Sequence, residues 1–194
     1  MKNEEMSLRT KQALAASLKR TMLKKPLSKI SVRELIEDCN VNRKTFYYHF
    51  DDIYALVKWM LDQEAIELVK QFDLTVNYKE AISFTLDYVE TNKHILNCAY
   101  DSMGRDGLKR FLYQDFIAVM RSIIDGCERQ LGLSVDEDFK QFAAGFYAEA
   151  VAGTLINVLQ SRGKYERETV TQDITLLFKS SIPAILSDRA GKSQ

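Results

Sequence analysis

The chain has 194 residues, of which 46% are hydrophobic, and its formal net charge is zero. This apolar content is sufficient for a substantial core. The three cysteines, Cys39, Cys98 and Cys127, show no CxxC spacing, which excludes a typical disulfide framework or zinc site. We therefore expect no metal and no other cofactor. Because no apolar run approaches the roughly 20 residues needed to cross a bilayer, we also expect a cytoplasmic protein without membrane contact.

The charge is segregated along the chain. Residues 1–50 contain 11 Lys and Arg against 5 Asp and Glu, whereas residues 51–194 contain 16 against 22. A basic N-terminal segment suits contact with nucleic-acid phosphates, because bound cations release counterions, and an acidic body is repelled by them. Such an asymmetry also arises by chance on solvated surfaces, so the charge alone leaves both interpretations open.

The predicted elements are all helices. Only two prolines occur, glycines are few, and alternating β-branched runs are absent. A basic helix is expected over 8–24, ending before Pro26, because the residue that precedes a proline disfavours the helical conformation. Ser31-Val-Arg-Glu34 is a capping box that begins a short second helix, which Asn40-Val41-Asn42 interrupts.

The second part of the chain is expected to be a helical body. Asp51, as N-cap, and a continuous apolar stripe predict a long fourth helix over 53–72. Capping boxes at Ser134–Glu137 and Thr169–Gln172 predict the starts of the last two helices, and Pro183 predicts a kink or an early stop. The remaining ranges complete the prediction: helices over 78–91, 93–100, 108–131, 135–162 and 170–188, with a loop over 102–107. We thus expect a three-helix head, residues 1–52, and a C-terminal helical domain, residues 53–194.

Residues 31–52 have the pattern of a helix-turn-helix, in which the second helix presents its N-terminal side chains to the bases of DNA. Its centre reads NRKTFYYHF, residues 42–50, where Phe46 and Phe50 are spaced to face inward. Arg43 suits guanine and Asn42 suits adenine or a phosphate, while the other polar groups suit phosphate oxygens. The candidate DNA-contacting residues are Arg33, Asn42, Arg43, Lys44, Thr45, Tyr47, Tyr48 and His49.

The segment 41–50, set between a capped short helix and a long helix, resembles the head of TetR-type transcriptional regulators. The resemblance covers about residues 8–60, and 46–61 is similar to the branch related to regulators of dihydroxyacetone kinase operons. It implies a one-component regulator, by expectation a repressor, that binds a pseudo-palindromic operator in double-stranded DNA as a homodimer. It also implies that a small-molecule effector in the C-terminal domain controls binding.

The resemblance carries over to single positions as well. Arg33 matches a position that often reaches a base or a phosphate, and Arg43 matches the base-reading position. Ile53 stands where many members carry a phosphate-binding lysine. We therefore expect the basic first helix, through Arg9, Lys11 or the Lys24-Lys25 pair, to supply compensating phosphate contacts.

A dimer interface is expected in the body, because one recognition helix contacts too few base pairs for useful specificity. Small residues recur among aromatics over 142–155, which would let helices approach closely. Packing within one subunit would explain the same pattern. The candidate interface residues are Ala144, Gly145, Ala148, Ala152, Leu155, Ile174 and Phe178.

An effector pocket is expected among the helices between about 78 and 160, because the interiors of helical bundles are common ligand sites. The sequence shows no dominant charged cluster that would identify the ligand. The candidate polar lining residues are His94, Tyr100, Tyr113, Arg121, Tyr147 and Asn157, each of which could equally be a surface or a core residue.

Three alternatives remain open from the sequence. The body could dock a partner protein instead of a small ligand, which an exposed apolar patch without a cavity would favour. His94 and Cys98 are four residues apart and could meet on a helix, but a Cys–His enzyme needs an orienting third group and an oxyanion site, and neither is evident. A metal sensor is disfavoured because two histidines and three scattered thiols form no recognisable ligand set. We expect the chain not to be an enzyme.

Overall fold

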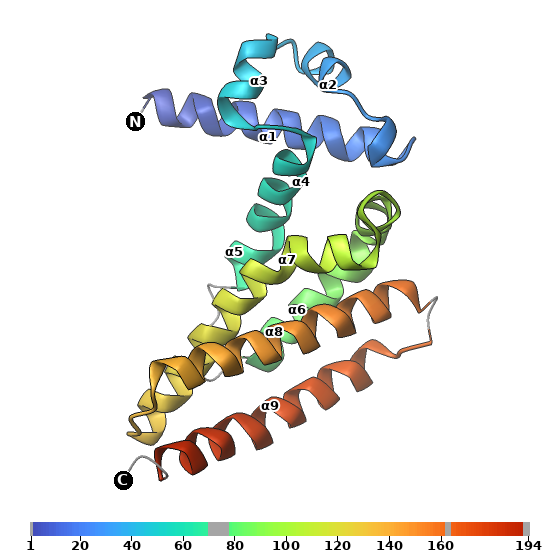
Figure 1. Cartoon of the computed structure of the whole chain (residues 1–194). Coiled ribbons are helices and arrows are strands. Elements are labelled where there is room, and N and C mark those ends of the chain that lie inside the picture. The colour runs from blue at the N-terminus through green and yellow to red at the C-terminus, as the bar shows by residue number, and fades with distance from the viewer. Residues whose placement is uncertain (1, 70–77, 162–163, 192–194) are drawn as a thin grey trace.

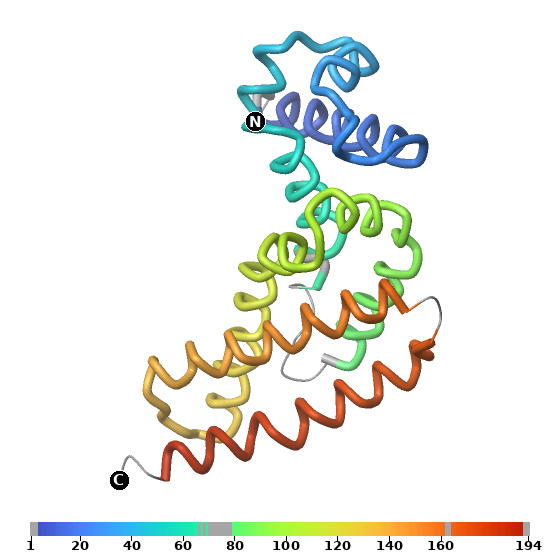
Figure 2. The backbone as a smooth tube through the Cα atoms, turned by 45° about the vertical axis from the view of Figure 1, so that its right-hand side comes forward, coloured from blue at the N-terminus to red at the C-terminus, as the bar shows by residue number. Residues whose placement is uncertain are grey.

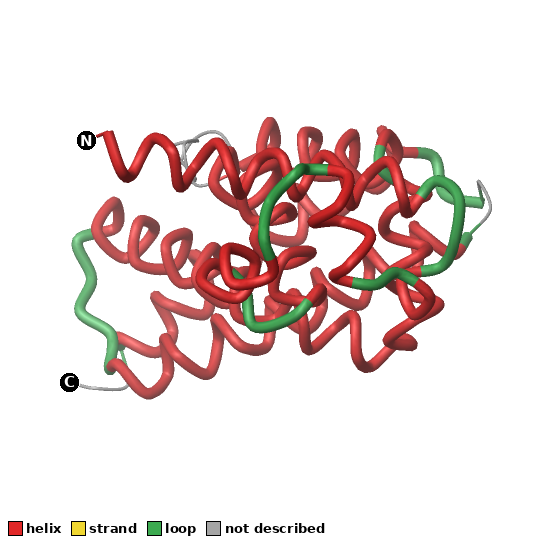
Figure 3. Tube along the Cα trace, turned by 90° about the horizontal axis from the view of Figure 1, so that it is seen from above, coloured by secondary structure: helices red, strands yellow, loops and turns green. Residues whose placement is uncertain are grey.

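The structure is a computed structural model that describes residues 2–69, 78–161 and 164–191. All elements in these ranges are helices or loops, so the predicted all-α class is confirmed (Figure 3). The elements are α1 (Lys2–Met22), a 3-10 turn η1 (Leu27–Lys29), α2 (Val32–Asp38), α3 (Arg43–His49), α4 (Ile53–Leu61), a π-helical turn η2 (Asp62–Ile66), α5 (Glu67–Val69), α6 (Tyr78–Thr91), α7 (Lys93–Leu131), α8 (Glu137–Gln160) and α9 (Arg167–Ala190).

The molecule is elongated, with a small head at one end and a larger helical body at the other (Figures 1 and 2). The head consists of α1, α2 and α3. Helix α4 leaves the head and runs into the body, which is formed by α6 to α9, with α8 and α9 lying side by side along one face. The predicted boundary between residues 52 and 53 thus falls directly before the connecting helix.

Polar contacts attach the head and α4 to α7. The backbone amide of Leu27 donates to Sγ of Cys98 at 3.0 Å. The hydroxyl oxygens of Tyr54 and Ser102 lie 3.0 Å apart. Lys58 of α4 pairs with Asp115 of α7, and burial raises the pKa of that carboxyl. The buried apolar residues of head and body also form one continuous cluster, so the position of the body constrains the position of the head.

The region of the predicted fourth helix differs from the prediction. The carboxylate of Asp52, not of Asp51, caps α4 by accepting the backbone N–H of Ala55 at 2.8 Å. The helix does not run unbroken, because the π-helical turn η2 follows it and α5 ends at Val69. The rest of the predicted range, 70–72, lies outside the described residues.

The predicted break at 102–107 is present but shorter than expected, because two helical segments of α7 meet at a kink at Gly104. Gly104 has φ +70°, a left-handed conformation that a glycine adopts without steric penalty. The predicted helices 93–100 and 108–131 lie on either side of this kink. Gly132, with φ +63°, ends α7 as predicted.

The starts of the last two helices also differ from the prediction. Asp136, not Ser134, caps α8 by accepting the N–H of Phe139 at 2.9 Å. Glu166 precedes α9, so Thr169 lies inside the helix. Pro183 does not stop α9, which continues to Ala190. By length and composition α8 is the one helix in the described ranges that could cross a membrane, but it packs into the body.

Candidate nucleic-acid interface and effector cavity

Two side-chain caps fix the geometry of the helix-turn-helix. The hydroxyl of Ser31 accepts the N–H of Glu34, whose carboxylate accepts the N–H of Ser31 at 3.0 Å, as the capping box predicts. Asn42 caps α3: its Oδ1 accepts the N–H of Thr45 at 2.8 Å. Leu35 and Phe46 are fully buried between the two helices. The angle between α2 and α3 is therefore held by both caps and packing.

The predicted contact residues differ in exposure and in their partners. Arg43, Lys44, Tyr47 and Tyr48 are exposed. The guanidinium of Arg43 lies 5.4 Å from the ring centroid of Tyr47, and its Nη2 donates to the Tyr47 hydroxyl at 3.4 Å. This stacking presents the Arg43 guanidinium on the outer surface of α3, at its first turn.

Three further candidates have partners within the head. Arg33 is exposed and donates to Glu37 at 2.7 Å, and this hydrogen bond raises the pKa of Arg33. The oxygen of Asn42 also accepts the hydroxyl of Thr45 at 3.1 Å, so that oxygen is engaged within the helix. Thr45 itself is half-buried. Asn42 thus has a capping role that the sequence analysis did not assign to it.

His49 is half-buried at the end of α3. Burial, and next the ammonium of Lys11, lower the pKa of His49, so the ring is neutral at pH 7. A neutral ring can donate one hydrogen bond to a phosphate but adds no charge. Lys11 lies 6.0 Å and 5.8 Å from the ring centroids of Phe50 and Trp59. It therefore places one cation of α1 beside α3.

The other cations expected to compensate for Ile53 lie at both ends of α1. Arg9 pairs with Glu5 at 2.7 Å, and Lys25 pairs with Glu34. Lys24 is exposed. Ile53 itself is half-buried and packs against the core, so its side chain serves packing.

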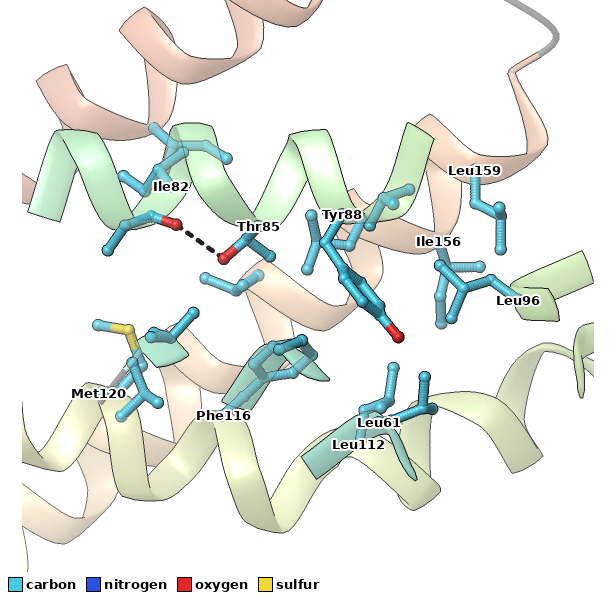
Figure 4. A pocket seen from close by; sticks show the side chains of 18 of the residues that line it. Leu61, Ile82, Thr85, Tyr88, Leu96, Leu112, Phe116, Met120, Ile156 and Leu159 are labelled. Atoms are coloured by element: carbon cyan, nitrogen blue, oxygen red, sulfur yellow. Dashed lines mark hydrogen bonds between the residues drawn. The ribbon is translucent and has the colours of Figure 1, made fainter. Parts of the chain in front are cut away.

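The body contains a cavity of about 110 Å³ lined by residues of α4 to α9 (Figure 4). Among the described residues that line it, two have polar side chains, Thr85 and Tyr88, and both are hydrogen-bonded. The Thr85 hydroxyl donates to the carbonyl oxygen of Ala81 at 2.8 Å, and the Tyr88 hydroxyl donates to Glu64 at 3.0 Å. Apolar residues that line the cavity include Leu61, Ile82, Leu96, Leu112, Phe116, Val119, Met120, Ile156, Leu159 and Ile174.

None of the six polar candidates is among the described residues that line this cavity. His94 is exposed and Tyr100 is half-buried. The other four lie elsewhere in the body: Tyr113 beside Gly145, Arg121 in ion pairs with Asp125 and Glu137, Tyr147 hydrogen-bonded to Ser181, and Asn157 hydrogen-bonded to Arg105. Tyr88 was not among the predicted lining residues, because its i+4 spacing from Phe84 and to Asn92 is ordinary for a helix and does not distinguish it.

The candidate interface residues lie largely inside the subunit. Ala144, Ala148 and Ala152 are fully buried there, and Leu155, Ile174 and Phe178 line the cavity. Gly145 permits close approach to Tyr113, since an added Cβ would lie 3.0 Å from its hydroxyl oxygen. The small residues therefore serve packing within the subunit, the alternative considered above. Four other apolar side chains of α8 and α9 are exposed by 63% to 69%: Phe142, Phe146, Leu176 and Leu177.

A family model described as "Transcriptional regulator C-terminal region", of TetR type, matches residues 77–180, more than half of the chain. The chain belongs to the TetR family of transcriptional regulators. The matched range covers α6 to α8 and most of α9, so it includes most of the cavity. The expected family is thus confirmed by the C-terminal domain, for which the sequence had predicted only a series of helices.

Two relatives refine this assignment. The chain is 23% identical over 91 residues, 47% of its length, to the HTH-type dhaKLM operon transcriptional activator DhaS of Lactococcus lactis subsp. lactis (strain IL1403). The match spans about half, 49%, of that relative. The solved structure of a dihydroxyacetone kinase operon activator DhaS has the same fold, with a TM-score of 0.67 and 18% identity over 89% of this chain and 96% of the other. The resemblance to the DhaS branch is thus confirmed.

Membership of this family makes the chain a transcriptional regulator and not an enzyme. The geometry at His94 and Cys98 agrees with this. Burial raises the pKa of Cys98, which keeps the thiol protonated, and its sulfur accepts the amide of Leu27. His94, by contrast, is exposed. No group of three or more potential metal ligands occurs among the described residues.

Proposed function

We propose that this regulator binds a pseudo-palindromic operator as a homodimer in the cytoplasm, and that a small molecule in the body cavity controls its affinity for DNA. The observation that carries the proposal is the outer surface of α3. There, Arg43 and Lys44 stand exposed on the first turn of a helix that the Asn42 cap and the buried Phe46 hold in place. A short, rigid, basic helix of this kind fits the major groove.

The contacts divide by chemistry. Arg43 carries a planar guanidinium that can donate two hydrogen bonds to O6 and N7 of guanine. Lys44, Tyr47, Tyr48 and Thr45 reach phosphate oxygens, which set the position of the helix without reading sequence. Glu37 and a DNA phosphate would compete for the guanidinium of Arg33, which lies at the start of α2. Specificity therefore rests mainly on Arg43.

The exposed apolar side chains of α8 and α9 support the proposed dimer. Phe142 and Phe146 are four residues apart on α8, and Leu176 and Leu177 are exposed on the neighbouring α9. Large apolar side chains left in water cost free energy, which burial against a second copy recovers. A two-fold symmetric dimer is needed because the two half-sites of an operator lie about 34–36 Å apart and each is read by one α3 helix.

The cavity favours a small-molecule effector over a docked partner protein. It lies within the matched regulatory region and has a volume suited to a small ligand. Control by a protein would instead require an apolar surface separate from the α8 and α9 face. The DhaS relative is an activator. Activators and repressors both bind operators. Expression of a reporter gene placed beside the operator would therefore show whether this protein activates or represses transcription.

Selection of genomic DNA fragments by the purified protein tests the proposal. The expected result is strong enrichment of a few intergenic fragments that share a two-fold symmetric sequence. A protein with Arg43→Ala and Lys44→Ala together serves as the control and should enrich none of them. Recovery of random fragments by the unmodified protein would contradict sequence-specific binding.

A further inference from the structure

We infer that the body cavity binds a small, neutral, apolar ligand of about the size of benzene, and that Tyr88 transmits its presence to the head through Glu64 and Lys19. The inference deepens the proposed function and rests on it for the effect on DNA. Tyr88 of α6 lines the cavity, and the chain of contacts runs from it through Glu64 of η2 to Lys19 of α1.

The lining determines the chemical class of the ligand. Apart from Thr85 and Tyr88, the side chains that the structure places around the cavity are apolar. A charged ligand would lose its hydration there without gaining a partner of opposite charge, which is strongly unfavourable. Thr85 already donates to Ala81 of its own helix, so it offers a ligand little. A neutral hydrocarbon-like molecule meets no such penalty.

The volume sets the size. An engineered apolar cavity of about 150 Å³ in another protein stays dry and binds benzene. The cavity here, at about 110 Å³, is of the same order. A single aromatic ring or a short aliphatic chain therefore fits after small movements of the lining, whereas a multi-ring ligand requires repacking of the core.

Tyr88 connects the cavity to the head. Figure 4 shows its ring projecting from α6 among the lining side chains. Its hydroxyl donates to Oε2 of Glu64 at 3.0 Å, and Nζ of Lys19 donates to the same oxygen at 2.5 Å. Lys19 belongs to α1 of the head, so a single carboxylate oxygen joins an α6 residue of the body to an α1 residue of the head.

Three features of the surroundings affect this junction. Burial, and next the charge of Glu64, raise the pKa of Tyr88, which keeps the hydroxyl protonated and able to donate. The side chains of Lys19 and Glu64 are each about one third exposed, so water competes with their pairing. Glu64 lies in the π-helical turn η2, a type of turn that often occurs at functional sites.

A bound ligand acts on the ring of Tyr88. It occupies the space beside the ring and displaces the hydroxyl from Glu64, which then changes its pairing with Lys19. The head shifts relative to the body, and the two α3 helices of the dimer no longer match the half-site spacing. The expected change in operator affinity is about fivefold or more, within the usual range of coupling between two sites.

Three full-length proteins test the inference, with toluene as the probe and benzoate and glycerol 3-phosphate as charged comparisons. Tyr88→Phe keeps the ring and removes the hydroxyl. Tyr147→Phe is the matched control, because it removes a hydroxyl bonded to Ser181 outside the cavity. Calorimetry measures ligand binding, anisotropy measures operator affinity, and hydrogen exchange measures opening of α1 without DNA.

The expected results are these. Toluene binds the unmodified protein and both variants, while benzoate and glycerol 3-phosphate do not. Toluene changes operator affinity about fivefold and raises exchange in α1 around Lys19 in the unmodified protein and in Tyr147→Phe. In Tyr88→Phe both effects fall below about twofold.

Each contrary result has a distinct meaning. Binding of a charged comparison compound but not toluene overturns the ligand class. An unchanged toluene effect on α1 exchange in Tyr88→Phe overturns the role of Tyr88. If none of the proteins prefers any DNA sequence, the proposed function fails, whereas toluene binding with Tyr88-dependent exchange in α1 would still support the inference.

Discussion

The backbone amide of Leu27 in the head donates to the sulfur of Cys98 in the body at 3.0 Å, across 71 residues of sequence. The same sulfur lies 3.7 Å from the carbonyl oxygen of Lys25. The short segment between α1 and α2 is therefore bonded directly to α7. Because the segment leads into the helix-turn-helix, this contact helps to fix where α2 and α3 stand.

We expect Cys98→Ala to destabilise the protein by about 1–3 kcal/mol, because the buried amide of Leu27 loses its acceptor. Urea unfolding measures the change. Cys127→Ala, at a half-buried position on the same helix, is the control and should cost less. An equal loss of unfolding free energy in the two variants would show that the hydrogen bond from the Leu27 amide to Cys98 does not stabilise the protein.

Substitutions of Asn42 show whether its main role is to cap α3 or to contact a base. Asn42→Ala should destabilise the protein by about 0.5–2 kcal/mol through loss of the α3 cap, whereas Asn42→Ser should retain most of the stability. We expect the serine variant also to keep its DNA specificity, because the oxygen of Asn42 is engaged with Thr45. Thermal unfolding and operator titration provide the two measurements. Relaxed base preference in Asn42→Ser would identify the amide as a base reader.

The dimer face can be tested with a single charge. Leu177→Glu should convert the dimer into a monomer, because a carboxylate buried in an apolar contact is strongly unfavourable. Sedimentation velocity measures the mass, and Leu23→Glu, at an equally exposed position directly after α1, is the matched control. A dimer that survives Leu177→Glu, or a monomeric unmodified protein, would exclude this face as the interface.

The ion pair between Glu128 of α7 and Lys140 of α8 should make the stability of the protein depend on pH. Pairing with Lys140 lowers the pKa of Glu128 below its ordinary value of 4.5, so the native state favours the ionised form. The stabilisation is complete above pH 4.5 and is lost as the pH falls through the native value. Melting temperatures between pH 7 and pH 3 should fall less steeply in a Glu128→Gln variant. Parallel curves would contradict the assignment.

Local signals predicted the head well. The Ser31 capping box and the i, i+4 spacing of Phe46 and Phe50 depend on neighbours in sequence, and the structure shows all three as expected. Asp52 took the place of Asp51 as N-cap because adjacent carboxylates give the same sequence signal. The break predicted over 102–107 is confined to Gly104, where two helical segments of α7 meet at a kink.

The body was predicted less completely, for a physical reason. The cavity is formed by apolar residues from six helices, and apolar residues at helical spacing look identical whether they fill a core or surround a space. The face that the alanines of α8 present depends on where α7 packs, which no local pattern specifies. Tyr88 likewise has significance only through Glu64, 24 residues away.

Titration of a selected operator and a shuffled fragment of equal length with the unmodified protein, Arg43→Ala and Lys44→Ala tests the central claim most directly. The account predicts that the unmodified protein prefers the operator at least about 10³-fold. Arg43→Ala should lose about 1–3 kcal/mol and relax one base position, while Lys44→Ala should weaken binding to both fragments and reduce the salt slope by about 1. Equal affinity of the unmodified protein for the two fragments would contradict the account.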